Sequence, residues 1–246
     1  MIAIIAAMDI ELKPLLKRIK VEKKIEERKY YFIEGRYKNK KIVLVKTGVG
    51  FKNAVKAVEK LVNSYTLKKV LGVGVAGAVK KELNIGDIVI PAFWISEEME
   101  DEFKMDETLF MLARKQAEYF KGRICFAGQG MSVRKVFSKE DKIESAQKHK
   151  EIIAIDMESY GWSKVLAKNN IPFIVLKSIS DTLNFKFPAD LRLIKEKYKI
   201  KDLLEVIKTC VPFKLRDLSV VLIFLRNWKK AIRKNIKFVE IMLDKI

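Results

Sequence analysis

Cysteine and histidine are scarce in this 246-residue chain. The two cysteines, Cys125 and Cys210, lie far apart, and they form neither a disulfide framework nor a zinc-binding pattern. The single histidine, His149, lies in the charged run SAQKHKE. Its position argues against histidine-based catalytic triads and histidine-ligated metals. The low cysteine content also fits a reducing compartment, so we expect a cytoplasmic protein.

Long hydrophobic runs are also missing. None approaches the roughly 18 to 20 residues that a membrane span requires. The first residues, MIAIIAAM, are apolar but lack the basic segment of a signal peptide, and Asp9 and Glu11 follow at once. We therefore expect the chain to begin with a buried strand.

Acidic residues are outnumbered, with 31 Asp and Glu against 50 Lys and Arg, for a net charge of +19. A nucleic-acid-binding protein would gather its cations with aromatic residues or in a reader motif. Here lysines are spread along the chain and mixed with glutamates, as in residues 21–28 and 195–201. A solvated, lysine-rich surface is the favoured interpretation, and no nucleic-acid partner is expected.

What the chain does have is apolar runs of strand length alternating with helical patterns. Hydrophobic residues make up 49% of it, enough for a globular core. The alternation predicts a single α/β domain over residues 1–187, with three layers and a mixed, mostly parallel sheet between helices. Strands are expected at 2–7, 30–34, 41–46, 69–75, 88–91, 123–127, 152–157 and 173–179, and helices at 10–19, 52–64, 105–120, 139–148 and 158–168.

Residues 188–246 form a C-terminal extension with a different character. A charged helix is expected at 191–209, followed by a long helix or helix pair at 215–246. In the latter, apolar residues recur every three or four positions, and the remaining positions carry Arg226, Lys229, Lys230, Arg233, Lys234 and Lys237. Such a helix packs on its own domain, on a second subunit, or on an anionic membrane surface.

The segment from Ile152 to Leu183 is the most informative. Two apolar runs flank a helical stretch of the length that joins parallel strands, so it reads as a β-α-β unit. Glu158 and Asp181 would then both follow the carboxyl ends of parallel strands, where open α/β sheets bind their ligands. Separately, Glu158 would be an ordinary residue at a helix start and Asp181 a turn residue. Together, the two carboxylates predict a ligand-binding site at this end of the sheet.

Five motifs in order give the chain a family resemblance: IIAAMDIE at 4–11, TGVG at 47–50, GVAGAVKKELNIGDIVIP at 74–91, IDMES at 155–159 and SISD at 178–181. Over residues 1–185 the chain resembles the nucleoside phosphorylase/nucleosidase superfamily, which includes methylthioadenosine/S-adenosylhomocysteine nucleosidases and purine nucleoside phosphorylases. The IDMES variant and the long C-terminal extension resemble the hopanoid-associated branch, which acts on adenosylhopane.

The resemblance implies roles for particular residues. Asp181 would protonate N7 of the leaving purine, a task that requires a carboxyl group holding a proton. Glu158 would accept the ribose 2′- and 3′-hydroxyls, and Met157 would pack against the sugar. Glu11 would position the nucleophilic water, and Ser180 would orient the carboxyl group of Asp181.

Further residues of the expected substrate site are glycines and a base pocket. Gly48 and Gly77 would let the backbone approach sugar or nucleophile. Val136 and Phe137 would contact the purine, Phe137 by stacking, although a core aromatic is nearly as consistent with the pattern. Val75 stands where many family members carry Ser or Thr, which weakens the case for a phosphate site.

The resemblance thus implies cleavage of the N-glycosidic bond of a 5′-modified adenosine with release of adenine. An adenosylhopane-like substrate is the first expectation, and methylthioadenosine or S-adenosylhomocysteine is the alternative. The acceptor would be phosphate or water, with no metal or organic cofactor, in a homo-oligomer. A relative that binds nucleotides or nucleic acids and has lost catalysis is the non-enzymatic alternative.

Overall fold

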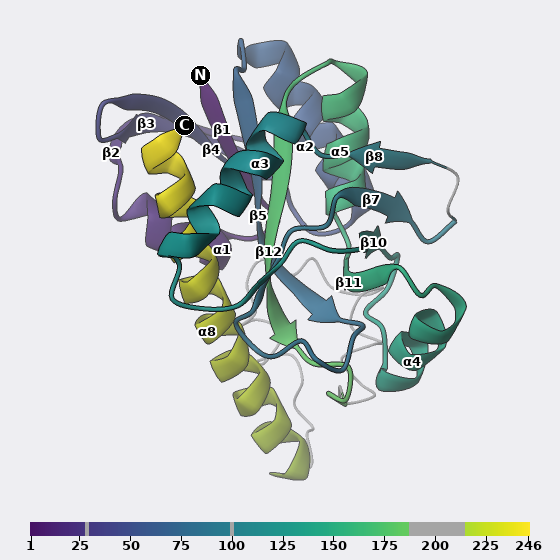
Figure 1. Ribbon diagram of the computed structural model, residues 1–246. Coiled ribbons are helices and arrows are strands. Elements are labelled where there is room, and N and C mark those ends of the chain that lie inside the picture. The colour runs from purple at the N-terminus through teal and green to yellow at the C-terminus, as the bar shows by residue number, and fades with distance from the viewer. Residues whose placement is uncertain (28–29, 99–100, 187–214) are drawn as a thin grey trace.

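The computed structural model describes residues 1–27, 30–98, 101–186 and 215–246 (Figure 1). Within these ranges the strands join into one twelve-stranded sheet. The strands are β1 (Ile2–Ala6), β2 (Lys20–Glu26), β3 (Tyr31–Tyr37), β4 (Lys40–Lys46), β5 (Lys69–Ala78), β6 (Ile88–Val89), β7 (Phe93–Ser96), β8 (Glu102–Lys104), β9 (Ile124–Cys125), β10 (Gln129–Ser132), β11 (Ile152–Asp156) and β12 (Phe173–Asp181). The helices are α1 (Asp9–Leu16), α2 (Phe51–Ser64), α3 (Glu107–Gln116), the 3₁₀ turn η1 (Ala117–Tyr119), α4 (Lys139–Lys148), α5 (Ser159–Lys168) and α8 (Leu215–Lys245).

Helices cover both faces of the sheet. In β1, Ile2, Ile4 and Ala6 point into a core shared with α1, α3 and α8, whereas Ala3 and Ile5 point into a core shared with α2 and α5. Because successive side chains of a strand face opposite sides, a strand covered on both faces reads as an unbroken apolar run. The expected class, a three-layer α/β domain with a mixed sheet and a C-terminal helix, is confirmed.

Helix α8 packs along the sheet beside β5 and β12 and buries Trp228, Ile232, Ile236 and Val239 against it. Its buried Asn235 bridges two strands. The side-chain oxygen of Asn235 accepts from the Gly74 amide at 3.2 Å, and its Nδ2 donates to the Leu176 carbonyl at 2.8 Å. The start of α8 extends past the carboxyl end of β12 (Figure 1). None of the helices in the described ranges is long and apolar enough to cross a membrane.

Strand β5 is the axis of the site, and the direction of its neighbours differs from the sequence-based expectation. Strand β12 runs parallel to β5, but β11 runs antiparallel to it, with Ile155 opposite Gly77. The two strands of the expected β-α-β unit therefore run in opposite directions, and the expectation that Glu158 and Asp181 both follow the carboxyl ends of parallel strands is wrong. The antiparallel course directs the chain after β11 back along β5, toward the carboxyl ends of β1 and β4, whereas Asp181 stays beside Gly77.

Most of the expected elements are present, with shifted ends. The hairpin of β3 and β4, the helices α1 to α5 and the strands β1, β5, β11 and β12 correspond to predicted segments. Four strands were missed, namely β2, β7, β8 and β10. The β2 strand was missed because it is exposed and lysine-rich, as edge strands often are. The helix expected at 191–209 lies outside the described residues.

Candidate active site

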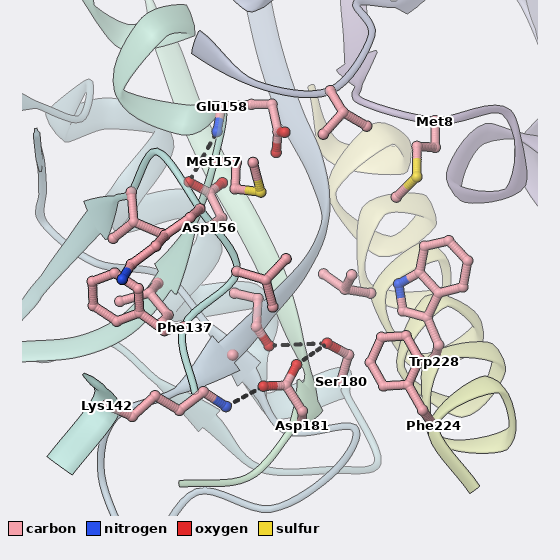
Figure 2. Close-up of a pocket in the computed structure, with 18 of the residues that line it drawn as sticks. Met8, Phe137, Lys142, Asp156, Met157, Glu158, Ser180, Asp181, Phe224 and Trp228 are labelled. Carbon is pink, nitrogen blue, oxygen red and sulfur yellow. Dashed lines mark hydrogen bonds and ion pairs between the residues drawn. The ribbon is translucent and has the colours of Figure 1, made fainter. Parts of the chain in front are cut away.

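A cavity of about 240 Å³ opens where β5, β11, β12, α4 and α8 meet (Figure 2). It is lined by residues from segments far apart in the sequence. They are Met8, Glu11, Val49, Val75, Ala76, Gly77, Val133, Lys135, Val136, Phe137, Lys142, Ile155, Asp156, Met157, Glu158, Ser180, Asp181, Phe224 and Trp228. Glu158 and Asp181 lie at opposite ends of it, and Met157 lies near Glu158.

Glu158 is held at the cavity wall by the turn that follows β11. Its Oε1 accepts from the Gly50 amide at 2.7 Å. Gly50 precedes α2 and has a φ of +87°, a conformation that glycine adopts without strain. This conformation points the Gly50 N–H at the Glu158 carboxylate. Burial, reinforced by the negative charge of Asp156, raises the pKa of Glu158 to about 8. The group can therefore exchange a proton near neutral pH.

Beneath Glu158 lies a buried ion pair between Asp156 and Lys177, with Lys177 Nζ 2.9 Å from Asp156 Oδ2. Lys177 also lies over the ring of Trp162, 4.4 Å from its centroid. Burial alone would lower the pKa of Lys177, but the negative charges of Asp156, Glu11 and Glu158 outweigh it and raise that pKa. The lysine is thus a fixed positive charge that offsets three buried acids.

Asp156 also shapes the turn that presents Met157 and Glu158. Its carboxylate accepts from the Ser132 hydroxyl at 2.6 Å, from the Glu158 amide at 3.2 Å, and from both the amide and the hydroxyl of Ser159. These donors satisfy a buried charge and fix the entry into α5.

Glu11 reaches the cavity from the first turn of α1. It accepts from the Met8 amide at 3.0 Å and, through Oε1, from the Val75 amide of β5 at 3.1 Å. Burial raises the pKa of Glu11. The carboxylate leaves no room beside Gly74, where a Cβ would lie 2.5 Å from Glu11 Oε1. The glycine in β5 therefore makes space for the acid.

Asp181, at the end of β12, has a donor on each oxygen. Ser180 Oγ donates to Oδ1 at 2.7 Å, and Lys142 Nζ forms an ion pair with Oδ2 (Figure 2). Lys142 is 1% exposed and also donates to the Thr182 carbonyl at 3.1 Å. It comes from α4, whose start is fixed by reciprocal hydrogen bonds between Ser138 and Asp141.

Apolar side chains close the cavity on two sides. Phe137, just before α4, lies on one side, and Phe224 and Trp228 of α8 lie on the other, with Met8 above them in Figure 2. A flat, weakly polar ligand would fit between these walls with its polar edges toward the acids.

Eight of the nine site residues named from the sequence line this cavity: Glu11, Gly77, Val136, Phe137, Met157, Glu158, Ser180 and Asp181. Gly48 is not among the lining residues. It belongs to the turn before α2, where its amide donates to the Ala7 carbonyl at 3.0 Å. The sequence did not single out Lys142, Asp156 or Lys177. The signal for Lys177 was a lone lysine in the apolar run FIVLKSIS.

Comparison with known proteins gives matches over most of the chain. The phosphorylase superfamily model (PNP_UDP_1) matches residues 1–200. The 5′-methylthioadenosine/S-adenosylhomocysteine nucleosidase of Buchnera aphidicola is 32% identical, over 77% of this chain and 91% of that protein. The protein of the same name from Bacillus thuringiensis is 28% identical, over 73% of this chain and 85% of that protein.

Solved structures share the fold. The 5′-methylthioadenosine/S-adenosylhomocysteine nucleosidase of Neisseria meningitidis, in complex with methylthio-immucillin-A, has a TM-score of 0.78 at 21% identity, covering 100% of this chain and 99% of that one. The futalosine hydrolase of Helicobacter pylori also has a TM-score of 0.78, at 23% identity, covering 100% of this chain and 97% of that one.

Proposed function

The chain belongs to the phosphorylase superfamily, and on that premise we propose that it hydrolyses the N-glycosidic bond of a 5′-substituted adenosine and releases adenine. The observation that carries this proposal is the convergence of Glu11, Glu158 and Asp181 on one cavity with Met157 between the two ends. Such a reaction needs an acid for the leaving base, a contact for the sugar hydroxyls, and a base for the attacking water.

Asp181 is the acid in this proposal. As the bond between C1′ and N9 breaks, its electron pair moves into the purine, and the proton of Asp181 goes to N7. Ser180 keeps the carboxyl group oriented through its 2.7 Å bond. The Lys142 ammonium group forms an ion pair with the other carboxyl oxygen, so both oxygens of Asp181 are held in place.

Glu158 and Glu11 act at the sugar end. Glu158 accepts the ribose hydroxyls, and Met157 packs on the sugar face. Glu11 takes a proton from the water whose oxygen attacks C1′. A buried carboxylate with a raised pKa suits this role, because a base works best when its pKa lies near the operating pH. Val75 offers no hydroxyl to a phosphate ion, which supports water as the acceptor. We expect neither metal nor organic cofactor to take part.

Two kinds of 5′ group compete. The relatives at 32% and 28% identity are methylthioadenosine/S-adenosylhomocysteine nucleosidases, and the cavity is small for a ligand pocket. Both observations favour the small thioether substrates over our first expectation of an adenosylhopane-like lipid. The apolar wall of Phe224 and Trp228 keeps the lipid-linked adenosine as the second candidate.

Adenine release from methylthioadenosine, S-adenosylhomocysteine and adenosine, each with and without phosphate, tests the proposal. Release from the thioethers without phosphate is the expected result. Release only with phosphate would make the protein a phosphorylase, and turnover of a lipid-linked adenosine alone would favour the second candidate. If none is cleaved, the proposed activity is wrong. Sedimentation velocity on the same preparation tests the expected homo-oligomer.

A further inference from the structure

Helix α8 has a second face, opposite the one that packs on the sheet. Six basic side chains follow it at helical spacing, and we call them the cationic strip: Arg226, Lys229, Lys230, Arg233, Lys234 and Lys237. With 3.6 residues per turn these positions share one side of the helix. Trp228, Ala231, Ile232 and Asn235 are buried on the other side. Five of the six side chains are exposed and face away from the core. Lys234 is half-buried, and its Nζ donates to the Lys121 carbonyl at 2.7 Å beside the ring of Phe120.

Two large apolar residues continue the strip toward the start of the helix. Leu222 is 58% exposed and Ile223 is 52% exposed, and both line one surface hollow with residues of the strip. Both belong to the first three turns of α8, the helix whose start extends past the sheet (Figure 1). At the other end of the strip, Glu240 is paired with Arg18 at 2.7 Å. The face thus combines an apolar tip with a row of cations.

We propose that this face docks the protein on an anionic lipid bilayer. Cations beside a membrane surface are attracted by acidic headgroups, and an adjacent apolar pair inserts at the headgroup boundary. A nucleic acid would use the cations but not the exposed leucine and isoleucine, and in the described part of α8 the aromatic side chains lie on the core side. A second copy of the chain would set like charges against each other.

The same turns of α8 contribute both to the docking face and to the wall of the cavity. Phe224 and Trp228, which line the cavity, come from the same two turns of α8 as Leu222, Arg226 and Lys229. Docking would therefore bring the α8 wall of the cavity to within one helix diameter of the lipid headgroups. The inference rests on this surface alone and holds whatever nucleoside the cavity accepts.

Co-sedimentation of the full chain with vesicles tests the proposal. We expect binding to vesicles of equal parts phosphatidylglycerol and phosphatidylcholine at about 50 mM salt, and little binding to phosphatidylcholine alone. Binding should weaken strongly at about 500 mM salt, because screening shortens the reach of the cations. Absence of binding to the anionic vesicles at low salt would overturn the proposal.

A matched pair of variants locates the surface. Replacing Arg226, Lys229, Lys230 and Arg233 by Gln should lower the partition coefficient at least about 100-fold, since each cation contributes several-fold. Replacing four exposed lysines of α2 and α5 (Lys52, Lys56, Lys164 and Lys168) removes the same charge and should change binding far less. Equal losses in the two variants would reduce the effect to net charge and contradict a docking face.

The apolar tip gives an independent check. Leu222→Ser with Ile223→Ser keeps every charge, so it should leave the low-salt attraction but abolish the binding that remains at high salt. If the quadruple variant instead loses affinity for duplex DNA while vesicle binding is unchanged, the face recognises nucleic acid and the proposal is wrong.

Discussion

Lys142 Nζ and Oδ2 of Asp181 form an ion pair that is almost completely buried at one end of the cavity. The lysine comes from α4 and the aspartate from the end of β12, so the pair joins two elements that are far apart in sequence. Breaking a buried pair leaves one charge without compensation, which costs about 3 to 5 kcal/mol.

A double-mutant cycle measures this coupling. We expect Lys142→Met to lower the free energy of unfolding by about 3 kcal/mol, because the Asp181 carboxylate is left buried beside an apolar chain. In the Asp181→Asn background the same change should cost much less, since no charge remains to compensate. Urea titrations of the four proteins give the coupling energy. Additive effects of the two changes would show that the pair does not stabilise the fold.

Asp181→Asn tests the acid in the proposed reaction. Asparagine keeps the size and one oxygen of the side chain but has no proton of suitable acidity, so kcat for adenine release should fall about 10²- to 10⁴-fold. The affinity for substrate should change little. Stopped assays give kcat, and calorimetry with the unreacted nucleoside gives the Kd. Asp101→Asn, at an exposed position, is the control. Turnover like that of the unaltered protein would remove Asp181 from the acid role.

Glu158 should make stability depend on pH. In the folded protein it keeps its proton up to about pH 8, whereas its ordinary pKa is 4.5. Between these values the folded state binds more protons than the unfolded state, so the free energy of unfolding falls as pH rises. The steepest slope is about 1.4 kcal/mol per pH unit.

The measurement compares the unaltered protein with Glu158→Gln. Unfolding free energies determined between pH 5 and pH 8 should decline more steeply for the unaltered protein, because glutamine does not titrate. Parallel curves for the two proteins would mean that Glu158 is not the group responsible. Glu11, whose pKa is also raised, contributes in the same direction to both proteins.

Local patterns predicted the elements well where burial and periodicity agree. The apolar runs of β1, β5 and β12 and the apolar periodicity of α2 and α8 were readable because burial fixes which residues can stand there. Strand β2, with lysine or glutamate at most positions, has no such signal. The direction of β11 depends on which strand it pairs with, and a sequence does not contain that information locally.

The acids of the site were predicted because the family resemblance pointed to them. Their cationic partners, Lys142 and Lys177, were not predicted, because the sequence around a lysine does not distinguish a solvated helix position from a buried ion pair. Lys142 lies in the charged run KEDKIES and reads as a surface residue. Only the placement of α4 against the end of β12 turns it toward Asp181.

Gly77 gives the last prediction. An added Cβ at this position would lie 2.7 Å from Asp181 Oδ2 and 3.2 Å from Lys142 Nζ, so Gly77→Ala must push the acid or its partner aside. The backbone there does not have the left-handed conformation that alanine resists, and the fold should therefore tolerate the change. A displacement of about 1 Å in a catalytic group can cost about 10²-fold in rate, which is the loss in kcat that we expect.

The Asp181→Asn background separates this steric effect from a general one. If Gly77→Ala acts by moving the acid, it should add little to the loss already caused by Asp181→Asn, because the displaced group no longer donates a proton. Rates of adenine release from the four proteins decide the matter, with thermal unfolding as the check on folding. Losses that multiply in the double variant would mean that Gly77 serves the substrate directly, by letting it approach the β5 backbone, and that the acid is held in place by Ser180 and Lys142 alone.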